Sequence, residues 1–199
     1  MGSSAEEEMK YLVEVGRPTI LEIADENSCI FSTRLAVDYL QSKGILAEPM
    51  AVSLVAYSPE FVRRADELGS MPDQQLTQQW FEESPAVWSV GVGVPEKASS
   101  TSAGWEGHLV AIVEGRYLLD LSADQVSRPE KQMLVKPFFC ELALQQESFL
   151  SGGTLSVFSK QHALLLYHAR LNDRSYAQAA DWRNQQQHDL LLQRLQAGS

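Results

Sequence analysis

The sequence predicts an α+β fold, and three observations lead to this class. Apolar residues in the first part of the chain recur at helical spacing, the later part holds short apolar runs between turn residues, and residues 108–121 have the pattern of a β-hairpin. Helices followed by a run of antiparallel strands are typical of α+β proteins. With 199 residues, of which 44% are hydrophobic, we expect one domain over residues 1–199, with its core at about 18–170.

The clearest helix is predicted at residues 27–43. Phe31 and Leu35 are spaced four residues apart along one face, and Gly44 suits the C-terminal cap. Shorter helices are expected where prolines and capping residues mark a start, at residues 6–15, 18–24, 59–68 and 73–83.

Strands are predicted wherever short apolar runs lie between turn residues. These runs cover residues 51–57, 87–92, 108–113, 116–121, 155–158 and 163–170. Residues 173–196 are predicted to form one long C-terminal helix, with its apolar residues gathered near the end. This helix would pack against the domain, or else dock on a partner or a second copy of the chain. The expected architecture is a set of N-terminal helices packed on an antiparallel sheet, followed by the C-terminal helix.

The chain is acidic, with 16 Lys and Arg against 26 Asp and Glu and a formal net charge of −10. This balance argues against nucleic acid or an anionic membrane as a partner, because both require a positive surface. No apolar run approaches the ~20 residues of a membrane helix, and the acidic start is unlike a signal peptide. We therefore expect a cytoplasmic protein with free thiols at Cys29 and Cys140, with secretion by a signal-independent route left open.

Cys29 stands near the predicted start of a helix, where Asn27 is a good N-cap residue. Unpaired backbone N–H groups and the helix dipole in the first turn lower the pKa of a thiol and favour the thiolate. The same N–H groups can stabilise an oxyanion that forms beside the sulfur. The alternative is a small buried hydrophobic side chain, as most free cysteines are. Cys140 lies in an apolar run without a cap residue, so a structural role is expected for it.

The hairpin of residues 108–121 brings His108 and Asp120 together. A three-residue loop ending at Gly115 would set the two directly opposite each other on one face of the sheet. A two-residue turn would instead pair Leu109 with Asp120, but Glu-Gly is a weaker turn of that kind than Asn-Gly. An aspartate beside a histidine fixes the tautomer of the ring and stabilises the imidazolium. The alternative is a hydrogen bond that only caps the end of a strand.

A cysteine that opens a helix, a histidine on one strand and an aspartate on the next resemble the transglutaminase-like group of the papain-like cysteine enzymes. Residues 28–45 are similar to the nucleophile helix of that family and the strand after it, and residues 107–112 to its histidine strand. Residues 117–125 contain Asp-Leu-Ser-Ala-Asp-Gln and are similar to the aspartate segment of bacterial members, where Asp-x-Thr-Ala-Asp-Gln is usual. The resemblance covers roughly residues 20–140.

This resemblance implies a catalytic triad in which Cys29 is the nucleophile, His108 the general base and then the acid, and Asp120 the residue that orients the histidine. The backbone N–H of Cys29 would form part of an oxyanion hole. Leu109 and Val110 follow the histidine where many members have a small residue and then Trp, a departure that concerns the substrate groove more than the triad. Further substrate-binding or oxyanion residues would come from Asn27, Trp105 and Gln125.

The expected function is that of a cysteine-dependent hydrolase or acyltransferase acting on an amide or related acyl group, as a peptidase, amidase, deamidase or transglutaminase-like enzyme. The alternative is a catalytically inactive papain-like fold that serves as a protein-binding or assembly module, and a protein-directed effector deamidase or protease is a further one. The substrate would be a peptide or protein amide or a small acyl compound. The sequence contains no phosphate-binding loop, dinucleotide fingerprint or paired metal-ligand spacing, so no cofactor and no metal are expected.

Overall fold

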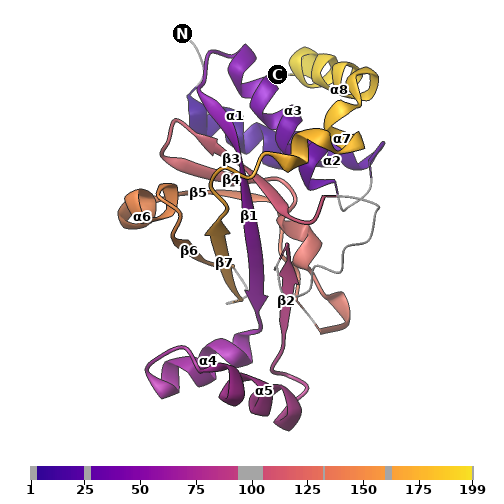
Figure 1. Cartoon of the computed structure of the whole chain (residues 1–199). Coiled ribbons are helices and arrows are strands. Elements are labelled where there is room, and N and C mark those ends of the chain that lie inside the picture. Colours follow the sequence, from indigo (N-terminus) through magenta and orange to yellow (C-terminus); the bar gives the residue numbers. More distant parts are fainter. Residues whose placement is uncertain (1–3, 25–27, 94–104, 132, 160–162, 199) are drawn as a thin grey trace.

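The computed structural model describes residues 4–24, 28–93, 105–131, 133–159 and 163–198, and within them the fold is α+β (Figure 1). Its centre is a sheet with the strand order β5-β4-β3-β1-β7-β6, and β2 also pairs with β1. Every ladder in the described part is antiparallel, so the predicted class is confirmed. The strands are β1 (Ala47–Tyr57), β2 (Ser89–Val92), β3 (His108–Val113), β4 (Tyr117–Asp120), β5 (Phe138–Glu141), β6 (Thr154–Phe158) and β7 (Leu164–Ala169).

β1 runs through the middle of the sheet and begins at Ala47, earlier than the expected residue 51. Pro49 lies inside it, although proline cannot donate a ladder hydrogen bond. The pairing with β7 starts only at Val52, and the N–H of Arg170 bonds to the carbonyl of Ala51 just past that end. Pro49 therefore sits where that side of β1 has no partner strand, and the missing donor leaves no gap in the ladder.

β2 and β3 lie end to end along the other side of β1, because β3 pairs with its first part and β2 with its second. At the junction the Ser53 hydroxyl donates to the carbonyl of Gly93 at 2.7 Å. A Cβ added to Gly93 would lie 2.6 Å from the Cα of Gly107, so the two backbones touch here. This junction places His108, the first residue of β3, at the middle of the sheet.

Helices from both ends of the chain cover one face of the sheet (Figure 1). The helix α3 (Cys29–Ser42) packs against β1 and β3, and α8 (Gln185–Gly198) packs against α3. The rest of the layer consists of α1 (Ala5–Tyr11), a π-helical turn (Leu12–Gly16) and α2 (Arg17–Leu21). The apolar core of this face includes Leu35, Leu40, Ala111, Leu119 and Leu191.

The opposite face of the sheet buries a second apolar cluster, formed with η3 (Ala123–Val126) and α6 (Gln146–Leu150). The segments after β4 and β5 also contain η4 (Pro129–Lys131) and η5 (Ala143–Gln145), which bury no residue. The cluster includes Val52, Val110, Ile112, Phe149 and Leu165.

A helical hairpin projects from the far end of β1 (Figure 1). It consists of α4 (Pro59–Leu68) and α5 (Gln74–Glu83), close to the predicted bounds. Ser58 and Asp73 cap the two helices through their side chains, as their positions in the sequence indicate. The hairpin has a small apolar cluster of its own around Phe61 and Trp80.

The β3–β4 hairpin has a register two residues away from the predicted one, so that prediction was wrong. His108 and Asp120 are diagonal neighbours, not directly opposite ones. The cause is the turn, where Glu114 as well as Gly115 has a positive φ, of 53° and 63°, and the N–H of Arg116 bonds to the carbonyl of Val113. A shift of two keeps every side chain on its predicted face, because side chains alternate along a strand.

The C-terminal segment does not form the single helix predicted for residues 173–196. It divides into η6 (Ser175–Gln178), α7 (Ala180–Arg183) and α8. Tyr176 and Trp182 are anchored beside the first turn of α3, whereas Leu191 is buried in the core farther along that helix. The chain becomes extended at Ala179, so the segment is not one continuous helix.

Candidate active site

Cys29 is the first residue of α3 and so lies in the first helical turn, as predicted. The N-cap is Ser28, not Asn27, which falls outside the described residues. Ser28 makes no capping hydrogen bond with its side chain, because its hydroxyl accepts one from the guanidinium of Arg17 at 3.2 Å. The backbone N–H of Cys29 is one of the groups that no earlier turn of the helix can satisfy.

His108 and Asp120, both fully buried, form a hydrogen bond of 2.7 Å between Nε2 and Oδ2. The backbone N–H of Ser122 donates to Oδ1 of Asp120 at 2.9 Å, and the hydroxyl of Tyr167 donates to Oδ2 at 2.9 Å. The carboxylate is thus fixed at both oxygens, and it holds the imidazole in turn. The structure therefore brings the two predicted residues together across the diagonal of the hairpin.

Because Nε2 of His108 bonds to Asp120, the other ring nitrogen, Nδ1, is the one left to interact with Cys29. Nδ1 of His108 has no hydrogen-bond partner among the described residues, and the Cys29 thiol donates to the carbonyl of Gly107 at 3.9 Å. Cys29 and His108 nevertheless influence each other's pKa. Thr33 stabilises this arrangement, since its hydroxyl donates to the carbonyl of Leu109 at 2.7 Å and ties α3 to β3. Cys29 therefore lies beside the buried His108–Asp120 pair.

The surroundings of Cys29 and His108 favour the charged forms of both side chains. Burial raises the pKa of the Cys29 thiol, but the hydrogen bond and charge of His108, the N–H of Leu109 and the side chain of Gln125 bring it below its ordinary value. Burial lowers the pKa of His108, but the charge and hydrogen bond of Asp120 and the contact with Cys29 raise it to about 10. Both directions favour a thiolate beside an imidazolium at neutral pH, the state in which a cysteine is nucleophilic.

Gln125, the second residue after the start of η3, acts on the same thiol. Its side chain lowers the pKa of Cys29, and its buried Nε2 has no hydrogen-bond partner among the described residues. Trp105 lies nearby but is turned elsewhere: its ring covers Gly107, where an added Cβ would lie 2.3 Å from it, and its indole faces Asp173. Nε1 of Trp105 is likewise buried without a hydrogen-bond partner among the described residues, so both side chains are candidate donors to the site.

Two buried residues of the site were not predicted. Tyr167 comes from β7, and no local signal in the sequence marks it. Arg17, whose exposed fraction is 1%, binds both carboxylate oxygens of Asp124 at 2.8 and 3.1 Å and also contacts the hydroxyls of Ser28 and Ser32 at 3.2 and 3.0 Å. The sequence signal for a buried polar partner such as Arg17 is the pair of Ser28 and Ser32, which lie one helical turn apart at the start of α3, because buried hydroxyls need polar partners.

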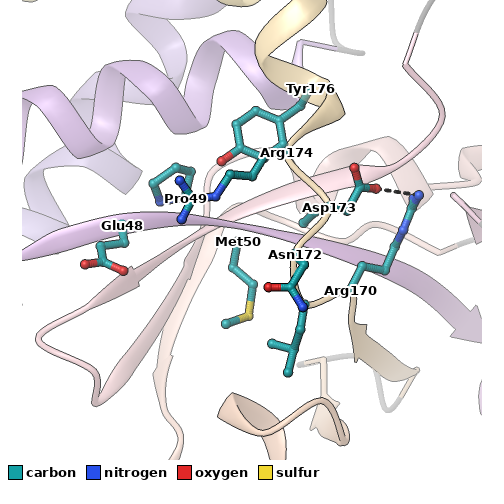
Figure 2. A pocket seen from close by; sticks show the side chains of 10 residues that line it. Glu48, Pro49, Met50, Arg170, Asn172, Asp173, Arg174 and Tyr176 are labelled. Atoms are coloured by element: carbon teal, nitrogen blue, oxygen red, sulfur yellow. Dashed lines mark ion pairs between the residues drawn. The ribbon is translucent and has the colours of Figure 1, made fainter.

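The site is enclosed by the C-terminal segment. Cys29 is 6% exposed and belongs to an apolar cluster with Tyr176 and Trp182. A cavity of about 290 Å³ lies next to this cluster, between residues 48–51 of β1 and residues 170–176 (Figure 2). Ala51 and Tyr176 belong to both the cavity wall and the cluster, so the cavity borders the enclosure of the nucleophile.

Comparison with known proteins does not add to this picture: no family model, no curated protein and no solved structure matches the chain. In the described ranges, no group of three or more His, Cys, Asp and Glu side chains is arranged to hold a metal ion. No helix in that part of the chain combines the length and apolar character needed to cross a membrane. Function has to be argued from the geometry of the site.

Proposed function

We propose that the chain is a cysteine-dependent hydrolase or acyltransferase of the transglutaminase-like, papain-like type, acting on an amide or related acyl group. The observation that carries this proposal is the buried His108–Asp120 hydrogen bond, with Cys29 beside it in the first turn of a helix and its pKa lowered by His108. A nucleophile, a base and a residue that orients the base are the parts that covalent acyl transfer requires. The order of the three residues along the chain supports the resemblance to that family.

In the first half of the reaction, the Cys29 thiolate attacks the acyl carbonyl carbon and forms a C–S bond. The carbonyl electrons move to oxygen, and the resulting oxyanion lies near the N–H of Cys29. The oxyanion then collapses, the C–N bond breaks, and the imidazolium of His108 gives its Nδ1 proton to the departing amine. A thioester on Cys29 remains, with His108 neutral and Asp120 still ionised.

In the second half, water or an amine attacks the thioester. His108 takes the proton of this attacking group at Nδ1, the C–S bond breaks, and the thiolate–imidazolium pair is restored. Water gives a carboxylic acid, which is peptidase, amidase or deamidase chemistry, and an amine gives a new amide. A protein-directed deamidase or protease would use the same steps and would differ only in its substrate.

One observation favours a second candidate. Because Cys29 is 6% exposed and His108 is fully buried, the same residues also suit a papain-like domain that binds a partner without catalysing a reaction on it. In that case the three residues serve as a buried polar network that holds α3 on the sheet. The two candidates differ in whether Cys29 is chemically activated.

The test is the rate of iodoacetamide alkylation at Cys29 as a function of pH, followed by peptide mass spectrometry. We expect an apparent pKa below the ordinary thiol value, which His108→Ala abolishes by removing the hydrogen bond and the positive charge. Cys140 is the internal control, because burial and the charge of Asp120 raise its pKa to about 11. A Cys29 that titrates like a free thiol with and without His108, or that does not react in the folded protein, would favour the binding module.

Formation of a thioester is the second half of the test. The probe is p-nitrophenyl acetate, an activated ester, and the readout is release of nitrophenolate together with one acetyl group added to the intact mass. We expect the acetyl group on Cys29 and its loss in Cys29→Ala. Acetylation spread over lysines, unchanged by Cys29→Ala, would count against an acyl-transfer enzyme.

A further inference from the structure

Two charged side chains in the wall of the cavity of about 290 Å³ form no ion pair with a described residue. Arg170 and Asp173 also line it, but they pair with each other at 2.5 Å, and Arg170 donates to the carbonyl of Glu106 at 2.8 Å. No ion pair or side-chain hydrogen bond joins Arg174 or Glu48 to another described residue, and both are exposed. A charged group free at the wall of a cavity is available to a ligand.

Strand alternation decides which of these two charges faces the side of the sheet that carries Cys29. Successive side chains of β1 point to opposite faces. Ala51 belongs to the apolar cluster of Cys29, so Pro49, two residues earlier, faces the same side. Met50 packs into the cluster of the opposite face, and Figure 2 shows Pro49 above the β1 ribbon and Met50 below it. Glu48 shares the face of Met50 and therefore points away from the sulfur.

Arg174 is on the side of Cys29. It precedes by two residues Tyr176, whose ring is packed in the cluster of the nucleophile. Arg174 and Pro49 line the same cavity, and Figure 2 shows the guanidinium on the Pro49 side of the β1 ribbon. Pro49 and Ala51 are about 7 Å apart along the strand. A molecule extended from the sulfur over Ala51 toward Pro49 therefore reaches the guanidinium after about two residues' length.

A carboxylate is the group that this side of the cavity suits best. A guanidinium presents paired N–H donors that match the two oxygens of a carboxylate. Asn172, in a left-handed conformation with a φ of 67°, also lines the wall, and its side-chain amide bonds to no described residue. Pro49 and Leu171 add apolar surface, against which the methylene groups of an acidic side chain can pack.

We infer that this cavity receives an acidic side chain of the substrate, whose carboxylate binds Arg174. The substrate class is then a peptide amide that carries an aspartate or glutamate within about two residues of the bond that Cys29 attacks. This inference rests on the proposed function and adds a substrate class to it. The chain itself has 26 Asp and Glu against 16 Lys and Arg, yet no described carboxylate pairs with Arg174.

The experiment measures the alkylation of Cys29 by three iodoacetamide derivatives of similar length. They are the N-iodoacetyl derivatives of γ-aminobutyrate, γ-aminobutyramide and putrescine, whose arms end in a negative, a neutral and a positive group. Each forms an S–C bond and releases iodide, so none of them depends on acyl transfer. We expect the second-order rate constant to be about tenfold higher for the anionic reagent than for the neutral one, and lowest for the cationic one.

Variants assign the charge preference to the cavity. Arg174→Gln should abolish the preference for the anionic reagent, and Arg174→Glu should reverse it. Asn172→Gly keeps the left-handed backbone and removes the amide, so it should reduce the preference by a smaller factor. Glu48→Gln should leave the order of the three reagents unchanged. The matched control is Arg194→Gln, which removes the same charge from an exposed arginine of α8 that pairs with Glu22.

The outcomes separate this inference from the proposed function. Equal rates of the three reagents at a Cys29 that forms a thioester overturn the acidic substrate class alone. A preference for the cationic reagent that Glu48→Gln abolishes also overturns it, as does an anionic preference that persists in Arg174→Gln or is lost equally in Arg194→Gln. An anionic preference that depends on Arg174, at a Cys29 that forms no thioester, supports the carboxylate site and overturns the acyl-transfer function. A Cys29 that reacts with none of the reagents overturns both.

Discussion

The hydroxyl of Tyr167 donates to Oδ2 of Asp120 at 2.9 Å, the oxygen that also lies 2.7 Å from Nε2 of His108. The hydroxyl keeps its proton, because burial and the charge of Asp120 raise the pKa of Tyr167 well above its ordinary value. Two donors therefore share one carboxylate oxygen, and each moderates the charge that the other experiences. The strength of the His108–Asp120 hydrogen bond is set partly from β7, a strand that carries none of the three predicted catalytic residues.

Tyr167→Phe should raise the pKa of His108 further. Without the hydroxyl, more of the negative charge of Asp120 acts on the imidazole, and the charged form of the ring gains stability. The variant should also lose about 1 kcal/mol of unfolding free energy for the missing hydrogen bond. NMR titration of the His108 ring and urea unfolding would measure the two effects. A lower pKa of His108, or an equal change in the distant Tyr57→Phe, would contradict this account.

Asp120→Asn should act in the opposite direction. The pKa of His108 falls because the charge that opposes its burial is gone, and the pKa of Cys29 rises because the ring beside it is now neutral at pH 7. Each unit of upward shift in the pKa of the thiol removes about 90% of the thiolate below that pKa. We expect alkylation at pH 7 to slow at least about tenfold, with the rate recovered at higher pH. An unchanged pH profile would show that Asp120 does not act on the sulfur through His108.

Gly107→Ala should disturb the site, although its backbone is not left-handed. The new Cβ would lie 2.3 Å from the ring of Trp105, which must move. We expect a loss of about 2 kcal/mol in unfolding free energy, typical of overpacking, together with a shift in tryptophan fluorescence. Gly115→Ala is the matched control: its Cβ meets no atom within 4 Å, so it introduces only the backbone strain of a positive φ. Equal fluorescence changes in the two variants would argue against the close packing of Trp105 on Gly107.

Trp182→Ala should open the enclosure around Cys29. Trp182 packs on Tyr176 with ring centroids 4.9 Å apart, and both belong to the cluster that covers the sulfur. We expect alkylation by a bulky fluorescent maleimide to accelerate relative to iodoacetamide, since the larger reagent is the more hindered one. The control is Trp80→Ala, which removes a tryptophan from the α4–α5 hairpin. Unchanged relative rates would show that another part of the chain limits access.

The local parts of the fold and site could be predicted because local signals encode them. The helix that carries Cys29 follows from apolar spacing, and the face shared by His108 and Asp120 follows from strand alternation. The register was missed because Glu114 adopts a left-handed conformation that its residue type does not favour, but the error of two residues preserved the face.

Parts set by contacts between distant segments could not be predicted. The guanidinium of Arg17 meets Asp124 across 107 residues, and a helical segment gives no sign of such a partner. Residues 173–196 have helical composition, yet the chain breaks where Tyr176 and Trp182 must reach α3. β5 was also missed, because its residues 138–141 become a strand only by pairing with β4.

The wide spacing of the site residues along the chain has a consequence for when reactivity arises. Asp124 is 107 residues from Arg17, Gly107 is 78 from Cys29, and Tyr167 is 47 from Asp120. Contacts at such separations close late, because each encloses a long loop of chain. A nascent or partly folded chain therefore lacks the contacts with His108 that lower the pKa of Cys29, and that pKa falls below its ordinary value only when the long loops have closed.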